Sequence, residues 1–169
     1  MNRGDPGEII MAATRYFEDF QVGETWRSAP WVLSAEEIMA FGHAYDPQPM
    51  HTDPQRAAAG PFGALVASGW HIAALTVRMF VDAGGYGATP VVGLGIDELR
   101  WLKPVRAGDQ LTVTREVIEV RRSESNPGRG IIRTRVTVTN QLGERTMSLV
   151  TAGGVPTRPQ GTDVKGDAA

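Results

Sequence analysis

The segment from Ser68 or Gly69 to about Ala83 constrains the fold most, because it is apolar on nearly every face of a helix. Its apolar residues are Trp70, Ile72, Ala73, Ala74, Leu75, Val77, Met79, Phe80 and Val81, and Gly84-Gly85 ends it. A helix that is apolar all round has to be buried. We therefore expect a long central helix wrapped by a sheet.

The second half of the chain alternates β-branched and polar residues, with a period of two that is clearest in 111–114 and 136–139. Four strands are predicted there, over 90–102, 110–121, 130–140 and 144–152. With residues 25–33 as a first strand, helices precede the sheet, and this order predicts an α+β fold. A meander is the simplest connection. Gly93-Leu94-Gly95 lies inside a strand pattern, which indicates a bulge or a close backbone approach and not a phosphate loop.

Composition limits the class of protein. The 169 residues suffice for one core and one domain, which we place at 15–155. Residues 156–169 cannot build a core, because Val164 is their only apolar residue apart from alanine, and residues 1–14 hold only a short apolar patch. Both ends are expected to be disordered, and either Met1 or Met11 is the start. The net charge of -2 gives no clustered basic excess for nucleic acid or an anionic membrane surface. The short apolar patch at 9–13 is too brief for a signal or a membrane span, so we expect a soluble cytoplasmic protein.

The absence of cysteine removes disulfides, thiolate zinc sites and cysteine nucleophiles from the possible chemistry. Serine nucleophiles are weak candidates as well, because Ser68 and Ser148 lack the strand, turn and helix of a serine hydrolase elbow.

Asp46 and His51 are the leading candidates for chemistry. They follow a short amphipathic helix predicted for 35–45, which starts at the capping-box pair Ser34 and Glu37. Three prolines in 46–54 stop that helix and hold the chain extended or turned, so both side chains lie on a stiff loop. A carboxylate beside an imidazole forms a proton-transfer pair. The alternative is a turn or cap aspartate with an isolated surface histidine.

Other ionisable residues near this loop have simpler interpretations. Asp53 before Pro54 has the pattern of a helix cap and predicts one or two helical turns over 54–59. A metal site that joins Asp53 to His43 or His71 is disfavoured, because no histidine pair has the helical spacing of a zinc hydrolase. His43 suits the end of the first helix, and His71 is expected to be a hydrogen-bonded core or interface residue.

Ser68-Gly69 at the start of the long helix is a second candidate site. The first N–H groups of a helix lack internal partners, and a glycine there lets a ligand carbonyl approach them. The alternative is that Gly69 only permits tight packing. An oxyanion donor next to a water-activating pair suits chemistry beside a thioester carbonyl. Basic residues that could meet the phosphates of a nucleotide-bearing thiol are Arg100, Lys103, Arg106, Arg121, Arg122 and Arg129.

Several of these motifs together resemble the hydratase motif of MaoC-like dehydratases and (R)-specific enoyl-CoA hydratases. They are Phe41-Gly-His-Ala-Tyr-Asp46-Pro-Gln-Pro-Met-His51-Thr-Asp53, Phe62-Gly63, Ala67-Ser68-Gly69 and, later, Leu102-Lys-Pro-Val-Arg-Ala-Gly-Asp109. The resemblance spans about 16–152. The chain departs from the family's usual Gly-Asp-x-Asn-Pro in having Tyr45 before Asp46 and Gln48 in the asparagine position.

The resemblance implies a hot-dog fold, a homodimer or dimer of dimers, and a role in fatty acid metabolism. It implies reversible hydration of a 2-enoyl-CoA to (R)-3-hydroxyacyl-CoA. Asp46 and His51 would then activate water, the Gly69 amide would support the thioester oxygen, and Gln48 and Ser68 would bind substrate. Neither a metal nor a cofactor is implied, since coenzyme A belongs to the substrate. A hot-dog acyl-CoA thioesterase and a non-catalytic acyl-CoA-binding subunit are the alternatives.

Overall fold

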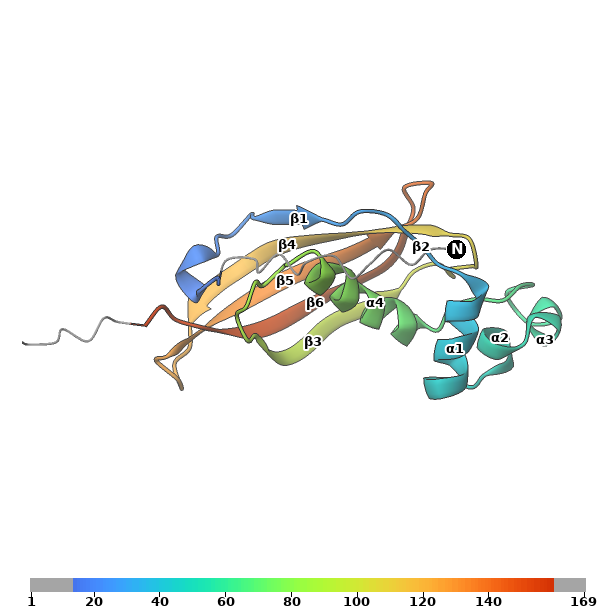
Figure 1. Cartoon of the computed structure of the whole chain (residues 1–169), viewed down its shortest axis with the longest axis horizontal. Helices are drawn as coiled ribbons and strands as arrows, with labels where there is room; N and C mark the ends of the chain where they lie inside the picture. Colours follow the sequence, from blue (N-terminus) through green and yellow to red (C-terminus); the bar gives the residue numbers. More distant parts are fainter. Residues whose placement is uncertain (1–13, 160–169) are drawn as a thin grey trace, which may run out of the picture.

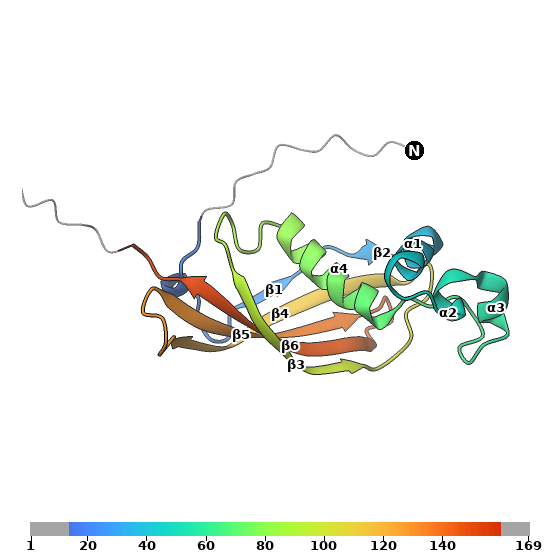
Figure 2. The ribbon, with the colours of Figure 1, turned by 90° about the horizontal axis from the view of Figure 1, so that it is seen from below.

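The computed structural model describes residues 14–159, so the predictions for 1–13 and 160–169, including the choice between Met1 and Met11, lie outside the described residues. One long helix, α4 (Gly69–Asp82), crosses one face of an antiparallel sheet (Figures 1 and 2). The strands are β1 (Thr25–Arg27), β2 (Trp31–Val32), β3 (Val92–Trp101), β4 (Gln110–Arg122), β5 (Arg129–Thr139) and β6 (Arg145–Pro156). None of the helices within 14–159 is long and apolar enough to cross a membrane.

The sheet differs from the expected meander. Its order is β1-β4-β5-β6-β3, and β2 also pairs with β4. Only β4, β5 and β6 are neighbours both along the chain and in the sheet. Strands β1 and β2 pair with the other edge of β4, and β3 pairs with the outer edge of β6. The strand predicted over 25–33 is divided into β1 and β2 around Pro30, which has no N–H to donate. The register of β3 shifts between Gly93 and Gly95, which confirms the bulge interpretation.

The long helix buries one face only. Ile72, Leu75 and Met79 of α4 join the core cluster that includes Val113 and Val136 of the sheet. On its other face α4 exposes apolar side chains, with Trp70 at 55%, Val77 at 56% and Val81 at 55%. The predicted wrapping of the helix by a sheet is confirmed, but the expectation that every face of the helix is buried is not met in the single chain, because the sheet curves around one side of α4.

Three short helices gather near the start of α4: α1 (Ala35–Tyr45), α2 (Pro49–Thr52) and α3 (Pro54–Ala58) (Figure 2). The predicted capping box is confirmed, since the Glu37 N–H donates to Ser34 Oγ and the Ser34 N–H donates to the Glu37 carboxylate. The segment 46–54 is not extended throughout. It contains the helical turn α2, which tolerates Pro49 at its first position because that N–H would have no helical partner.

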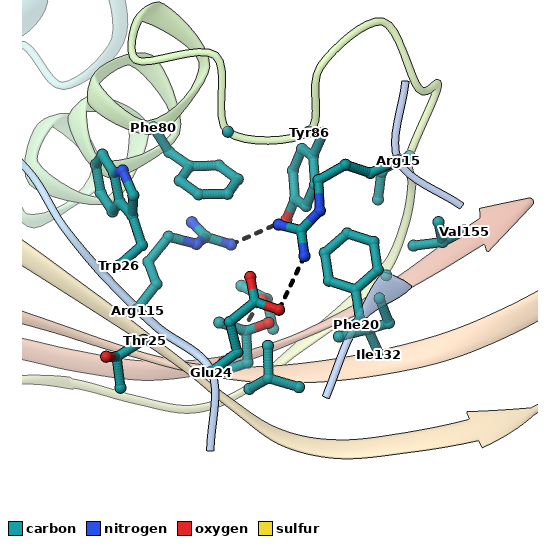
Figure 3. Close-up of a pocket in the computed structure, with 16 residues that line it drawn as sticks. Arg15, Phe20, Glu24, Thr25, Trp26, Phe80, Tyr86, Arg115, Ile132 and Val155 are labelled. Atoms are coloured by element: carbon teal, nitrogen blue, oxygen red, sulfur yellow. Dashed lines mark hydrogen bonds and ion pairs between the residues drawn. The ribbon is translucent and has the colours of Figure 1, made fainter. Parts of the chain in front are cut away.

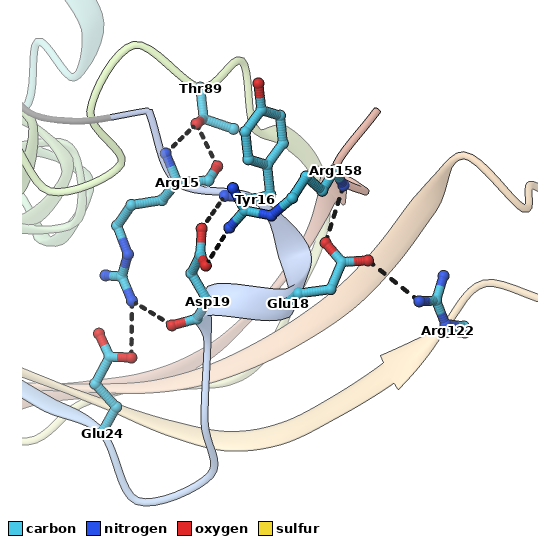
Figure 4. Close-up of polar contacts among 8 residues, drawn as sticks. All are labelled: Arg15, Tyr16, Glu18, Asp19, Glu24, Thr89, Arg122 and Arg158. Carbon is cyan, nitrogen blue, oxygen red and sulfur yellow. Dashed lines mark hydrogen bonds and ion pairs between the residues drawn. The ribbon is translucent and has the colours of Figure 1, made fainter. Parts of the chain in front are cut away.

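Polar contacts tie the two ends of the described chain together (Figure 4). The short 3-10 helix η1 (Phe17–Asp19) contributes Asp19, whose Oδ1 lies 2.6 Å from the Arg158 guanidinium. Glu18 accepts hydrogen bonds from the Arg158 backbone N–H and from the Arg122 side chain. The described chain thus continues past the expected domain boundary at 155, held by these charged contacts.

Candidate active site

Asp46 and His51 lie side by side at one cavity. Asp46 is the C-cap of α1 and His51 lies in α2, and Asp46 Oδ2 is 3.4 Å from His51 Nε2. Both line a cavity of about 460 Å³ between the short helices, the start of α4 and the end of β3. The two side chains therefore face one cavity and lie close enough together to contact the same water molecule.

The imidazole of His51 is held in one tautomer. His51 is only 5% exposed, and its Nδ1 lies 2.7 Å from the carbonyl oxygen of Val66. A carbonyl oxygen only accepts, so Nδ1 bears a proton and donates it to Val66. In the neutral ring Nε2 is then the free base, and it faces the Asp46 carboxylate and the cavity. This arrangement equips Nε2 to accept a proton from a molecule bound there.

Asp46 is held as a carboxylate by neutral hydrogen-bond donors. Its Oδ1 accepts from the Gln48 side-chain amide at 2.8 Å, and its Oδ2 accepts from Ser68 Oγ at 2.7 Å. These hydrogen bonds, that of Gln48 first, lower the pKa of Asp46 below its ordinary value of 3.8, and the charge of His51 adds a smaller effect. Gln48 and Ser68, predicted to bind substrate, are seen here to position the Asp46 carboxylate.

Backbone contacts fix the two catalytic candidates relative to the sheet. A Cβ on Gly42 of α1 would lie 2.6 Å from the His51 carbonyl oxygen, so only glycine lets α1 and α2 approach this closely. The Val66 N–H donates to the Met50 carbonyl, and the Ala67 N–H donates to the Val105 carbonyl. The stretch 66–67 therefore connects the turn that carries His51 to the strand side of the cavity.

The start of α4 presents its backbone to the same cavity. Ser68 is the N-cap, with its Oγ accepting from the Trp70 N–H, and the helix begins at Gly69 as predicted. Within 14–159 no hydrogen-bond acceptor is found for the Gly69 N–H, and Gly69 lines the cavity. A Cβ at Gly69 would also lie 2.2 Å from the Trp101 indole, so glycine is required for packing as well as being suited to access.

The outer wall of the cavity is largely apolar. Trp70 of α4 and Trp101 of β3 meet edge to face, with ring centroids 5.3 Å apart. Of the six basic residues considered for phosphate contacts, Lys103 alone lines this cavity, where it pairs with Glu144. Arg106 donates to the carbonyl of Phe62, another residue of the wall. Arg121 and Arg122 instead pair with Glu119 and Glu18.

The remaining predicted residues lie outside this pair. The Asp53 carboxylate caps α3 by accepting from the N–H groups of Gln55 and Arg56, as expected. His43 is exposed in the last turn of α1. Across 14–159, no three histidine, aspartate or glutamate side chains come together as possible metal ligands.

His71 was predicted to be a hydrogen-bonded core or interface residue, and the described residues of the single chain supply no hydrogen bond for it. Its ring stacks on Phe41 at 4.7 Å, and its buried Nδ1 has no partner among the described residues. Burial lowers the pKa of His71, and the charge of Glu37 opposes this effect. His71 is therefore a packed residue of α4 whose burial favours the neutral imidazole.

Three contributors to the site were missed by sequence reasoning. The Val66 carbonyl gave no signal, since a backbone acceptor can belong to any residue. Trp101 was assigned only to a strand, and its contact with Gly69 depends on the bulges of β3. Gly42 could have been found, because a glycine inside a predicted amphipathic helix indicates a close contact.

Comparisons with known proteins agree with this geometry. The family model of the MaoC like domain matches residues 19–140. The 3-hydroxyacyl-thioester dehydratase Z of Mycobacterium tuberculosis is 32% identical over 123 residues, which cover 71% of this chain and 79% of that protein.

Solved structures have the same architecture. The MaoC-like dehydratase from Rhodospirillum rubrum has a TM-score of 0.76 at 37% identity, covering 86% of this chain and 99% of that one. The (R)-hydratase from A. caviae involved in PHA biosynthesis has a TM-score of 0.65 at 27% identity, covering 84% and 99%. The expected α+β hot-dog fold is thereby confirmed.

Proposed function

Because the chain belongs to the MaoC-like domain family, we propose that it is a hydratase/dehydratase that interconverts a 2-enoyl-CoA and a (R)-3-hydroxyacyl-CoA. The observation that carries the proposal is the 3.4 Å approach of Asp46 Oδ2 and His51 Nε2 at one cavity. The names of the related thioester dehydratase and (R)-hydratase support the same class of reaction. The chemistry requires no group beyond the coenzyme A that the substrate carries.

In the hydration direction, a water molecule donates one hydrogen bond to Asp46 Oδ2 and the other to His51 Nε2. Its oxygen attacks the β carbon of the enoyl group while His51 takes a proton. His51 Nε2 then delivers that proton to the α carbon, so that the oxygen and both hydrogens of the water end in the product and both residues end as they began. Dehydration is the reverse. Asp46 stays ionised throughout, since Gln48 and Ser68 stabilise its charged form.

Attack at the β carbon moves negative charge onto the thioester oxygen. The Gly69 N–H, at the positive end of the α4 dipole, is the donor that lines the same cavity. A well-aimed donor of this kind in a dry site lowers the barrier by about 2.7–4 kcal/mol. We assign Gly69 this role beside its packing role against Trp101.

The experiment is an absorbance screen of the wild-type protein on short, long, branched and dicarboxylic enoyl-CoA substrates, with a parallel assay for free thiol. A hydratase consumes the enoyl absorbance and releases no thiol. Release of thiol from acyl-CoA with no enoyl change would identify a thioesterase. Absence of both activities on every substrate would favour a non-catalytic binding subunit.

We further propose that two copies associate edge to edge along strand β3, which lies beside the exposed apolar face of α4. Strand β3 is an edge strand whose ten residues are almost all exposed, including Leu94, Ile96 and Trp101. A long apolar edge invites pairing with another chain, and a second copy offers the same surface in return. Sedimentation is expected to give a dimer or a dimer of dimers that Ile96→Asp dissociates, and a monomeric wild type would refute this.

A further inference from the structure

A second buried ionisable site lies around Arg115, toward the last turn of α4. The inward positions of β4 are Leu111, Val113, Arg115 and Val117, so Arg115 replaces an apolar residue in a core row. It is only 6% exposed. Sequence periodicity places it there as well, since a strand residue two positions after Val113 shares its face.

Aromatic rings surround the guanidinium on one side (Figure 3). The Arg115 Cζ lies 4.3 Å from the centre of the Phe80 ring and 5.9 Å from that of Tyr86. Phe80 in turn packs edge to face with Tyr86 and Trp26. Such contacts attract a cation, but they leave its N–H groups without acceptors.

The charge of Arg115 is not neutralised within residues 14–159. Its Nη2 donates a hydrogen bond to the Tyr86 hydroxyl at 3.0 Å, and no carboxylate among these residues forms an ion pair with it. Glu24 lines the same cavity but pairs with Arg15 at 2.8 Å. The charged residues of the lining are two arginines and one glutamate, so one positive charge remains.

A buried cation without a counter-ion costs folding free energy that aromatic contacts and one hydroxyl do not recover. Burial indeed lowers the pKa of the Arg115 guanidinium, and the nearby Tyr86 hydroxyl partly opposes this. The same fold with a leucine or valine at this inward position would not carry this cost. The arginine therefore indicates an anionic ligand.

Two hollows meet at Arg115. One is a partly open cavity of about 130 Å³, and the apolar part of its wall includes Phe20, Ile132 and Val155. The other is an open groove of about 580 Å³ between α4 and β3, lined mainly by small and apolar residues such as Ala73 and Gly95. That groove also reaches Trp70, which lines the active-site cavity.

We propose that the cavity around Arg115 is a second binding site, which takes a carboxylate carried on an apolar chain. The planar guanidinium matches a carboxylate through two parallel hydrogen bonds, and the groove accommodates the chain. The carboxylate has two possible sources. It belongs either to a free fatty acid or to the far end of the acyl chain of the substrate, and the second source rests on the proposed hydratase function.

Calorimetric titration of the full chain with octanoate and with octanol tests the site without any assay of turnover. Octanoate is expected to bind saturably and more tightly than octanol by roughly tenfold to a hundredfold, the range for hydrogen bonds to a charged group. Arg115→Met, which keeps length and apolar contact, should remove this preference. Arg135→Gln is the matched control, because Arg135 is an exposed arginine of the adjacent strand that pairs with Glu116.

Octanoate is also expected to raise the melting temperature of the wild type and not that of Arg115→Met. Equal binding of octanoate and octanol by the wild type, or no binding, would overturn the proposal whether or not the variant folds. Loss of self-association in Arg115→Met without octanoate binding by the wild type would show that a second copy supplies the counter-ion, and would overturn it too.

A kinetic comparison separates the two sources. Enoyl-CoA substrates of equal length, with and without a terminal carboxylate, are assayed on the wild type and on Arg115→Met. If Arg115→Met selectively loses activity on the carboxylated substrate, the acyl chain is the source of the carboxylate. If the ratio of the two activities is unchanged although the wild type binds octanoate, the source is a free acid. Octanoate binding by a protein that hydrates no enoyl-CoA would refute the proposed function and leave this site standing.

Discussion

The ionisable groups near the two ends of α4 differ in how many polar partners the protein supplies to them. At its first turn, Asp46 and His51 each have donors or acceptors supplied by the protein, and they share an open cavity. At its last turn, Arg115 faces aromatic rings and a single hydroxyl. The first arrangement is complete and leaves Nε2 free for a proton, whereas the second lacks a counter-ion. A site whose polar groups have their partners in the protein is preorganised for chemistry. A buried charge that lacks a counter-ion indicates a site for a ligand.

The largest expected effect comes from Asp46→Asn, which keeps the shape of the side chain and removes its charge. Hydration should fall by about 10² to 10⁴, the range for loss of a proton-transfer group, with little change in melting temperature. Steady-state absorbance kinetics measure the rate and scanning calorimetry measures the stability. Near-normal turnover in a folded variant would show that the chemistry does not depend on the Asp46 carboxylate at the start of α4.

A smaller effect is expected from Ser68→Ala, because it removes one of the two neutral donors to the Asp46 carboxylate. Loss of a hydrogen bond to a charged group should lower kcat/KM by roughly tenfold to a hundredfold. An unchanged kcat/KM would show that Ser68 serves only as the N-cap of α4.

The same variant changes the response of stability to acid. The folded pKa of Asp46 is depressed, so its stabilisation is present above the unfolded pKa and is lost as the pH falls through the folded value. Ser68→Ala raises that folded value toward 3.8, so this contribution becomes smaller and its loss is complete at a higher pH. The melting temperatures of the two proteins are measured from neutral to strongly acid pH. An identical fall in melting temperature with acid in both proteins would contradict the prediction.

The two roles of Gly69 are separated by a double-mutant cycle with Trp101. Gly69→Ala alone places a Cβ against the indole and should cost about 1–3 kcal/mol of unfolding free energy, as overpacking does. In a Trp101→Ala background that cost should vanish, while turnover still falls by roughly tenfold, somewhat less than for outright loss of an oxyanion donor. If turnover in the Trp101→Ala background recovers together with stability, Gly69 serves only in packing and has no role as an oxyanion donor.

The smallest effect is expected for Asp53→Ala, the nearby carboxylate that caps α3. It should cost about 1 kcal/mol of unfolding free energy, as loss of an N-cap does, and leave kcat/KM unchanged. Urea unfolding and the absorbance assay measure the two quantities. A rate loss comparable to that of Asp46→Asn would show that the chemistry is not confined to one carboxylate.

Local patterns predicted most of the elements and the pair itself. The capping residues Ser34 and Asp53 begin α1 and α3, and the apolar run from Gly69 gives α4, because each signal acts within a few residues. The order of strands was not predictable from such signals. It depends on which sheet edge is free when β3 is placed, and that is a property of the whole sheet.

The site was predictable where side chains carry the chemistry and unpredictable where the backbone does. Asp46 and His51 were found from residue type and spacing, whereas the acceptor that fixes the His51 tautomer is a backbone carbonyl fifteen residues away. Arg115 was overlooked although its strand phase was visible, because a basic residue among alternating polar residues resembles a solvated position. Its burial follows from α4 and Tyr86 closing over it.

The central claim is that the protein adds water to the enoyl group and spares the thioester. The most direct measurement is mass spectrometry of the products formed from an enoyl-CoA by the wild type in water labelled with heavy oxygen. Label in the hydroxyl of an intact 3-hydroxyacyl-CoA, with that product strongly reduced in Asp46→Asn, is the predicted result. Label in a free carboxylic acid, with coenzyme A released, would contradict the claim.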